Sequence, residues 1–201
     1  MEVLTDIIGI VVAYVLVSNV ILTQFLGLCP FIGVSKNSES AVGMGFAVTF
    51  VMTLATMFTW MLYNWLLVPA GLEYLKIILF ILVIASLVQF VEMFVKKNSP
   101  ALYRALGIYL PLITTNCAVM GIALLVVEVE KLSLFNSVLA GFSAGIGFLV
   151  AILLMSAIRE QLEIEWVPKG FRGVPIAFIS AGLMAMAFMA FDKALLMNLV
   201  G

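Results

Sequence analysis

The stretch AVGMGFAVTFVMTLATMFTWMLYNWL, from Ala41 to Leu66, contains no charged residue. A helix crosses the hydrocarbon core of a bilayer when it has about 20 mostly apolar residues, so this stretch is long enough to span a membrane. The chain contains six such windows, which run from Ile7 to Leu28, Ala41 to Leu66, Leu72 to Val95, Leu106 to Val127, Leu134 to Ile158 and Val174 to Leu196. The sequence therefore predicts an all-α integral membrane protein with six transmembrane helices.

The composition of the chain supports this class. Of its 201 residues, 65% are hydrophobic and only 10% are charged, whereas a soluble domain has about 25% charged residues. A net charge of −1 without a basic patch argues against nucleic acid as a partner. The chain has no histidine, the commonest acid–base group and metal ligand. We expect one transmembrane domain over residues 1–201 with no soluble module.

The lysine and arginine residues between the windows predict an orientation. The first window follows Glu2 and Asp6 instead of basic residues, so we expect it to remain as a span and not to be cleaved as a signal peptide. Cytoplasmic loops carry an excess of Lys and Arg. With both termini on the non-cytoplasmic side, the inside loops hold Lys36, Lys96, Lys97, Arg104, Arg159, Lys169 and Arg172, and the outside segments hold Lys76, Lys131 and Lys193.

A weak internal repeat relates the two halves of the chain, approximately residues 1–98 and 99–201. A shift of 88 residues carries Cys29 onto Cys117, and a shift of 96 aligns AVGMGFA (41–47) with SVLAGFS (137–143). Each half contains three windows, and an odd number of spans makes the second half enter the membrane from the opposite side. We therefore predict two inverted three-helix repeats in which the two cysteines occupy equivalent places and can converge.

The two cysteines lie in unusual surroundings. In LGLCPFIGVSK (26–36), Pro30 disfavours helical geometry at Cys29, and Gly27 and Gly33 permit turns, so we expect the first span to be broken near this cysteine. A broken helix exposes N–H groups that can bond a thiolate. In PLITTNCAVMG (111–121), the run Thr114-Thr115-Asn116 offers further donors beside Cys117, and polar residues inside a membrane tend to mark function.

Several roles are compatible with this pattern. A buried cysteine often serves as a small hydrophobe, and the two cysteines can form a disulfide if they meet, although a thiol oxidoreductase typically has a Cys-x-x-Cys pair. Inverted repeats with broken helices also occur in secondary transporters. An iron–sulfur cluster takes four cysteines, so two would have to come from a second polypeptide, either a copy of this chain or a homologue.

The two cysteine motifs and the six-span layout resemble the RnfA/NqrE family of membrane subunits, over essentially the full chain. FIGVSK after Cys29 is similar to this branch, whereas the sister branch contains RnfE and NqrD. The resemblance implies that Cys29 and Cys117 are two ligands of an intramembrane [2Fe-2S] cluster shared with an RnfE-like subunit.

The resemblance also implies a place in a larger assembly. The chain would be one component, inactive alone, of an ion-translocating ferredoxin:NAD⁺ oxidoreductase in the bacterial inner membrane, together with Rnf subunits B, C, D and G. The cluster would relay electrons between ferredoxin and NAD⁺, coupled to Na⁺ or H⁺ transport. The alternatives are an NqrE-like component of a sodium-pumping NADH:quinone reductase and a secondary transporter without a redox centre.

Overall fold

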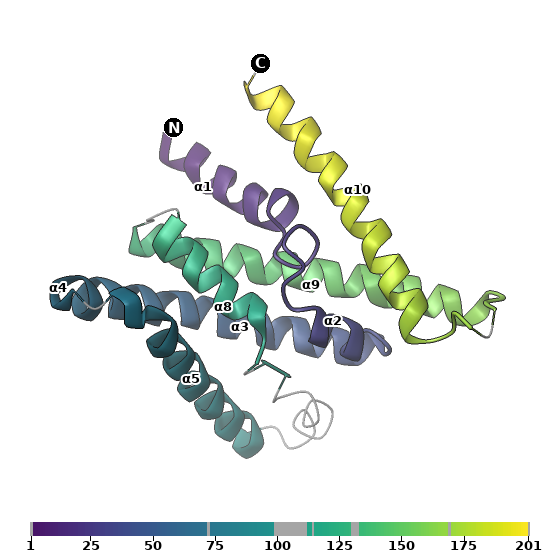
Figure 1. The fold of residues 1–201 in the computed structure, drawn as a ribbon, viewed down its shortest axis with the longest axis horizontal. Helices are drawn as coiled ribbons and strands as arrows, with labels where there is room; N and C mark the ends of the chain where they lie inside the picture. The colour runs from purple at the N-terminus through teal and green to yellow at the C-terminus, as the bar shows by residue number, and fades with distance from the viewer. Residues whose placement is uncertain are drawn as a thin grey trace.

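The computed structural model describes residues 2–71, 73–98, 112–113, 115–129, 133–168 and 170–200, and the described part is helical without strands. The helices are shown in Figure 1. They are α1 (Glu2–Val12), η1 (Ala13–Val17), α2 (Leu28–Val34), α3 (Ser38–Leu62), η2 (Tyr63–Leu67), α4 (Val68–Ala70), η3 (Glu73–Leu75), α5 (Lys76–Asn98), α8 (Cys117–Leu124), η4 (Leu125–Val129), α9 (Leu134–Ile164) and α10 (Val174–Val200). The predicted all-α class is confirmed.

Each of the six predicted windows contains an apolar helix. Three helices are long and apolar enough to cross a membrane: Ser38–Ala70, Lys76–Met93 and Leu134–Ile164. Three shorter apolar helices span Ile7–Val17, Cys117–Val127 and Val174–Met189. Of the predicted features, residues 106–111 of the fourth window, Arg104, Thr114, Lys131 and Lys169 lie outside the described residues.

Helices α3 and α9 form the centre of the molecule and lie side by side (Figure 1). Their contacts run in opposite directions along the sequence, because Gly45 packs on Leu149 and Gly141 packs on Thr56. Between these contacts, a Cβ on Gly145 would lie 2.6 Å from Cα of Thr49. Small residues thus let the two antiparallel helices approach to backbone contact.

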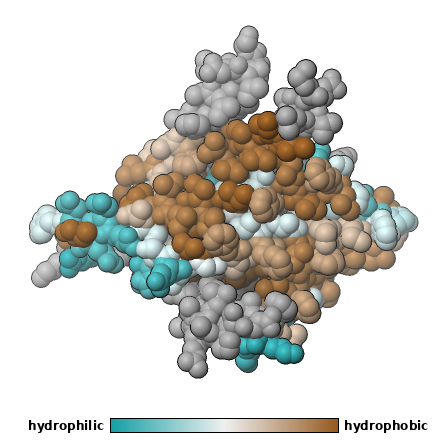
Figure 2. All heavy atoms as spheres, turned by 180° about the vertical axis from the view of Figure 1, so that it is seen from behind, coloured by the Kyte–Doolittle hydropathy of each residue, from teal (hydrophilic) through white to brown (hydrophobic). Residues whose placement is uncertain are grey.

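Helices from each half of the chain pack on this pair, each on the central helix of the other half. The α1–η1 segment packs on α9, and α8 packs on α3. Helix α10 contacts η1, while α5 contacts α8. The outer surface is rich in apolar side chains (Figure 2), with hydrophilic residues gathered toward the edges of the view. Exposed large hydrophobic residues on α5 include Ile78, Ile81, Leu82 and Phe90, as expected of a helix facing lipid or another protein of the membrane.

The first window is broken, as predicted. The η1 segment ends at Val17 and α2 begins at Leu28. The side chain of Asn19 is fully buried in the interruption. Its Oδ1 accepts from the amide of Ile21 at 3.1 Å, and its Nδ2 donates to the carbonyl of Gly147 at 2.8 Å. These bonds satisfy backbone groups that lipid cannot, which is the condition for irregular backbone at membrane depth.

The break lies before Cys29 and not at it, so the predicted non-helical geometry at this cysteine is wrong. Cys29 is the second residue of α2. Gly27 takes up the turn with φ of +81°, and Pro30 falls in the first helical turn. Proline is tolerated there because its missing N–H would have no intrahelical partner in any case.

Candidate functional site

Both cysteines lie in the first turn of a helix. Cys29 follows Leu28 at the start of α2, and Cys117 is the first residue of α8. Both are free thiols and both are exposed in this chain. Sulfur atoms at the chain surface are accessible to a ligand or to a neighbouring protein.

The two cysteine motifs are joined by a direct hydrogen bond. The backbone amide of Gly27, two residues before Cys29, donates to Sγ of Cys117 at 3.0 Å. Ninety residues of sequence separate the donor from the acceptor. The structure therefore brings the first motif onto the sulfur of the second, and the donor is one of the N–H groups that the broken helix leaves free.

Gly27 is tightly enclosed at this point. A Cβ on it would lie 2.9 Å from Oδ1 of Asn116 and 3.0 Å from Cβ of Ala118. Its φ of +81° also lies in the left-handed region that glycine adopts without strain. The amide can reach the Cys117 sulfur because the backbone approaches α8 so closely.

Asn116 is the polar residue of the second motif that the site buries. It precedes α8, and its Oδ1 accepts from the amide of Ala118 at 3.1 Å, which caps the helix. Asn116 is only 4% exposed, yet its Nδ2 has no partner within the described part of the chain. Thr115, by contrast, is exposed. A buried donor without an acceptor next to a cysteine calls for an explanation.

This hydrogen bond reaches one of the two sulfurs. The Gly27 amide donates to Sγ of Cys117, and hydrogen bonds to sulfur are one of the ways in which a protein tunes a metal-bound sulfur. Within the described residues, no group of three or more His, Cys, Asp or Glu side chains could hold a metal ion. The described part of this chain thus offers a pair of sulfur ligands and no complete metal site.

Arg159 is a neighbouring residue whose role the sequence did not reveal. The fifth window was expected to end at Ile158, with Arg159 in the following loop, but α9 continues to Ile164. Arg159 is only 9% exposed. Its Nη1 donates to the carbonyl of Ile32 at 2.6 Å and to Oγ of Ser35 at 3.0 Å. Arg159 thereby ties α9 to the C-terminal end of α2, the helix that carries Cys29.

Comparison with known proteins places the chain in a family. A family model described as "Rnf-Nqr subunit, membrane protein" matches residues 7–195. The chain belongs to the Rnf-Nqr family of membrane subunits. The expected resemblance is therefore confirmed at the level of the family, and the match includes both cysteine motifs.

Individual relatives of this Rnf-Nqr chain are similar over nearly their full length. A protein from Cronobacter sakazakii, which is named as the A component of an ion-translocating oxidoreductase complex, is 57% identical over 189 residues, which cover 94% of this chain and 97% of that protein. Proteins of the same name from Citrobacter koseri and Salmonella arizonae are each 56% identical over the same lengths. The name that all three share agrees with the A branch that the motif after Cys29 indicated.

Proposed function

We propose that this Rnf-Nqr chain is the A-type membrane component of an ion-translocating oxidoreductase complex, in which Cys29 and Cys117 supply two of the four thiolates of a [2Fe-2S] cluster. The similarity to A-type components of such complexes over 94% of the chain supports the place in the complex. The observation that carries the site is the 3.0 Å hydrogen bond from the Gly27 amide to Sγ of Cys117.

The residues present fit such a cluster. Two exposed thiols stand on two segments that are held together by that bond. The unpartnered Nδ2 of Asn116 is a further buried donor beside Cys117, and hydrogen bonds to the sulfurs are one of the means by which a protein sets the potential of an iron–sulfur cluster. Gly27 and Asn116 would position and stabilise the anionic sulfurs, while Cys29 and Cys117 would hold iron.

The remaining two thiolates would come from an RnfE-like sister subunit. The chain has two cysteines and no histidine, and a [2Fe-2S] cluster takes four such ligands. Both cysteines are exposed in this chain, which leaves them open to a partner subunit. Subunits B, C, D and G would complete an assembly in the bacterial inner membrane.

A [2Fe-2S] cluster takes up and releases one electron, so this site would serve as a relay between ferredoxin and NAD⁺, with electron flow coupled to Na⁺ or H⁺ transport. This chain's own residues would keep the two cysteine segments together. Asn19 and Arg159 contribute by fixing the two ends of the segment around Cys29 to α9.

We also propose that the six windows form two inverted repeats. Two-fold symmetry requires contacts to come in reciprocal pairs. A shift of 96 carries Gly45 onto 141 (45 + 96) and Leu149 onto 53 (149 − 96), and Gly141 contacts Thr56 and Met52, on either side of 53. Gly145 maps onto Thr49 (145 − 96), its own contact partner. These contacts support an axis that passes between α3 and α9 near Gly145.

The test measures iron and activity together in purified complex that contains the sister subunit. Cys29→Ser and Cys117→Ser should each abolish the electron paramagnetic resonance signal of the shared cluster and ferredoxin-to-NAD⁺ electron transfer, because serine is a much poorer ligand for iron than thiolate. Thr115→Ser, a small change in the same turn as Cys117, should leave both signals unchanged.

Iron content and activity also distinguish a shared cluster from an unshared cluster and from a secondary transporter. The chain purified without its sister subunit should hold no stable cluster, and co-expression should restore iron. A full complement of iron and sulfide on the chain alone would show that the cluster is not shared. Full electron transfer in either serine variant would remove that cysteine from the relay. Ion transport that persists without iron would favour a secondary transporter.

A further inference from the structure

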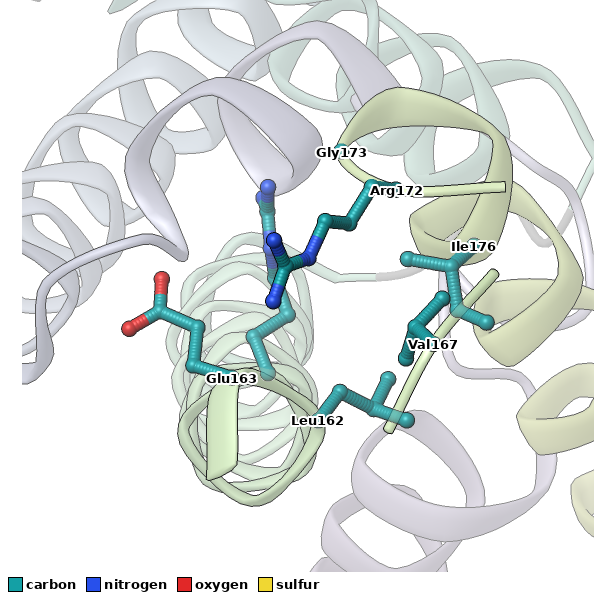
Figure 3. Close-up of a pocket in the computed structure, with 7 residues that line it drawn as sticks. Leu162, Glu163, Val167, Arg172, Gly173 and Ile176 are labelled. Carbon is teal, nitrogen blue, oxygen red and sulfur yellow. The ribbon is translucent and has the colours of Figure 1, made fainter. Parts of the chain in front are cut away.

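A second site lies where α9 ends and the chain turns toward α10. An open pocket of about 240 Å³ is formed here, and neither cysteine lines it (Figure 3). It is lined by Arg159, Leu162, Glu163, Val167, Arg172, Gly173 and Ile176. Figure 3 shows the side chain of Arg172 extending from the segment before α10 across the pocket.

The pocket combines two arginines with little to balance their charge. Arg159 is 9% exposed, and its Nη1 is bonded only to the uncharged Ile32 carbonyl and Ser35 hydroxyl. Within the described part of the chain, neither Arg159 nor Arg172 forms an ion pair, although Glu163 lines the same pocket. The pocket thus sets one carboxylate against two guanidinium groups, and its net positive charge favours an anionic ligand.

The wall of the pocket is apolar and its surroundings are typical of a membrane interface. Leu162, Val167 and Ile176 form the apolar wall. Just outside it, Trp166 is 87% exposed and Phe171 is 52% exposed. Exposed aromatic residues at the end of a spanning helix lie at the level of lipid headgroups. A ligand seated here would present an anion to the arginines and an apolar portion to the wall.

The geometry points to a binding site for the phosphate of an anionic phospholipid. Guanidinium groups bind phosphate through paired, charge-assisted hydrogen bonds, and basic pockets between transmembrane helices on the cytoplasmic side bind lipid headgroups. Bound phosphate would neutralise Arg159 and link the end of α9 to the start of α10 through Arg172. This inference does not depend on the iron–sulfur proposal, because it involves neither cysteine.

The test titrates a soluble short-chain lipid, dioctanoyl phosphatidylglycerol, into the delipidated purified complex. Binding is followed by native mass spectrometry and by the melting temperature, with dioctanoyl phosphatidylcholine and inorganic phosphate as parallel probes. Arg172→Gln should weaken phosphatidylglycerol binding roughly ten- to a hundredfold, as expected for the loss of a charged hydrogen-bonding partner. Lys97→Gln, which removes the same charge from the exposed end of α5, should not.

Compared with Arg172→Gln, Glu163→Gln should have the opposite effect on phosphatidylglycerol binding. Removal of this carboxylate from the pocket should tighten phosphatidylglycerol binding, a result that general damage to the fold would not produce. If inorganic phosphate alone gave the same Arg172-dependent effect, the anion site would stand with free phosphate as its ligand. Equal binding of phosphatidylglycerol by the Arg172→Gln and Lys97→Gln variants, or equal binding of the zwitterionic lipid, would overturn the proposal.

Discussion

At the scale of single residues, Gly27 links backbone conformation to sulfur chemistry. Its positive φ aims an amide at Sγ of Cys117, and its missing Cβ lets Asn116 and Ala118 pack against it. Pro30, three residues later, is tolerated because it lies in the first turn of α2. Gly27 and Pro30 in the first motif thus each have a separate structural reason.

Gly27→Ala should lower the free energy of unfolding by about 2–4 kcal/mol, because it adds left-handed strain of about 1–2 kcal/mol to crowding against Asn116. Unfolding by SDS titration in mixed micelles measures the change. Gly71→Ala is the matched control, since Gly71 also has a positive φ (+65°) but nothing lies within 4 Å of the added Cβ. Equal losses in the two variants would show that crowding at the cysteine site contributes nothing.

At the scale of elements, the antiparallel α3–α9 pair depends on the absence of side chains at a few positions. On α3, the hydroxyls of Thr49, Thr56 and Thr59 donate hydrogen bonds to backbone carbonyls of their own helix. These hydroxyls are therefore satisfied within α3, including Oγ1 of Thr56, the atom that a Cβ on Gly141 would meet first. Close packing and satisfied polar groups replace the hydrophobic effect, which lipid does not provide between helices.

Gly145→Ala should push α3 and α9 apart and reduce the free energy of unfolding by about 1–3 kcal/mol, the usual cost of overpacking. The reason is that the new Cβ would meet the backbone of Thr49 at 2.6 Å, which cannot rotate away. SDS titration again measures the loss. Gly182→Ala in α10 meets nothing within 4 Å and should be neutral or slightly stabilising. A neutral Gly145→Ala variant would contradict the observed close approach.

Sequence patterns revealed some of these elements and missed others for physical reasons. An uncharged run such as 41–66 identifies a spanning helix by length alone, and Gly27 with Pro30 predicted a break in the first window. Arg159 was assigned to a loop because a charge normally ends an apolar window. Its two acceptors, Ile32 and Ser35, lie more than 120 residues away, and no local periodicity reports such a pairing. The Gly27–Cys117 bond was hidden for the same reason.

At the scale of the whole molecule, the C-terminal end of α9 is hydrogen-bonded to the segment from the end of α2 to the start of α3. Ser38 bonds Glu160, and Arg159 reaches Ser35. The connection that contains Lys36 and the end of α9 that contains Arg159 therefore lie on one side of the molecule, as the charge-based orientation requires. The excess of basic residues predicts that this side faces the cytoplasm.

Reporter fusions should place both termini on the non-cytoplasmic side and the connection around residues 165–173 in the cytoplasm. Alkaline phosphatase fused after residue 201 should be active, whereas green fluorescent protein at the same place should not fluoresce. A fusion within the 165–173 connection should show the opposite behaviour. A cytoplasmic C-terminus with a non-cytoplasmic N-terminus would require an odd number of spans and exclude two inverted three-helix repeats.

The long-range hydrogen bonds also dictate when the protein can finish folding during translation. The bond from Asn19 Nδ2 to the carbonyl of Gly147 can form only after a further 128 residues have been synthesised. The bond from Arg159 to the carbonyl of Ile32 likewise requires a further 127 residues. Until α9 is synthesised, the interrupted first segment has buried polar groups without their partners. A nascent chain that stops before α9 therefore lacks the Gly147 acceptor for the Asn19 side-chain amide and the Arg159 donor for the Ile32 carbonyl, so the first segment reaches its final structure only after α9 is made.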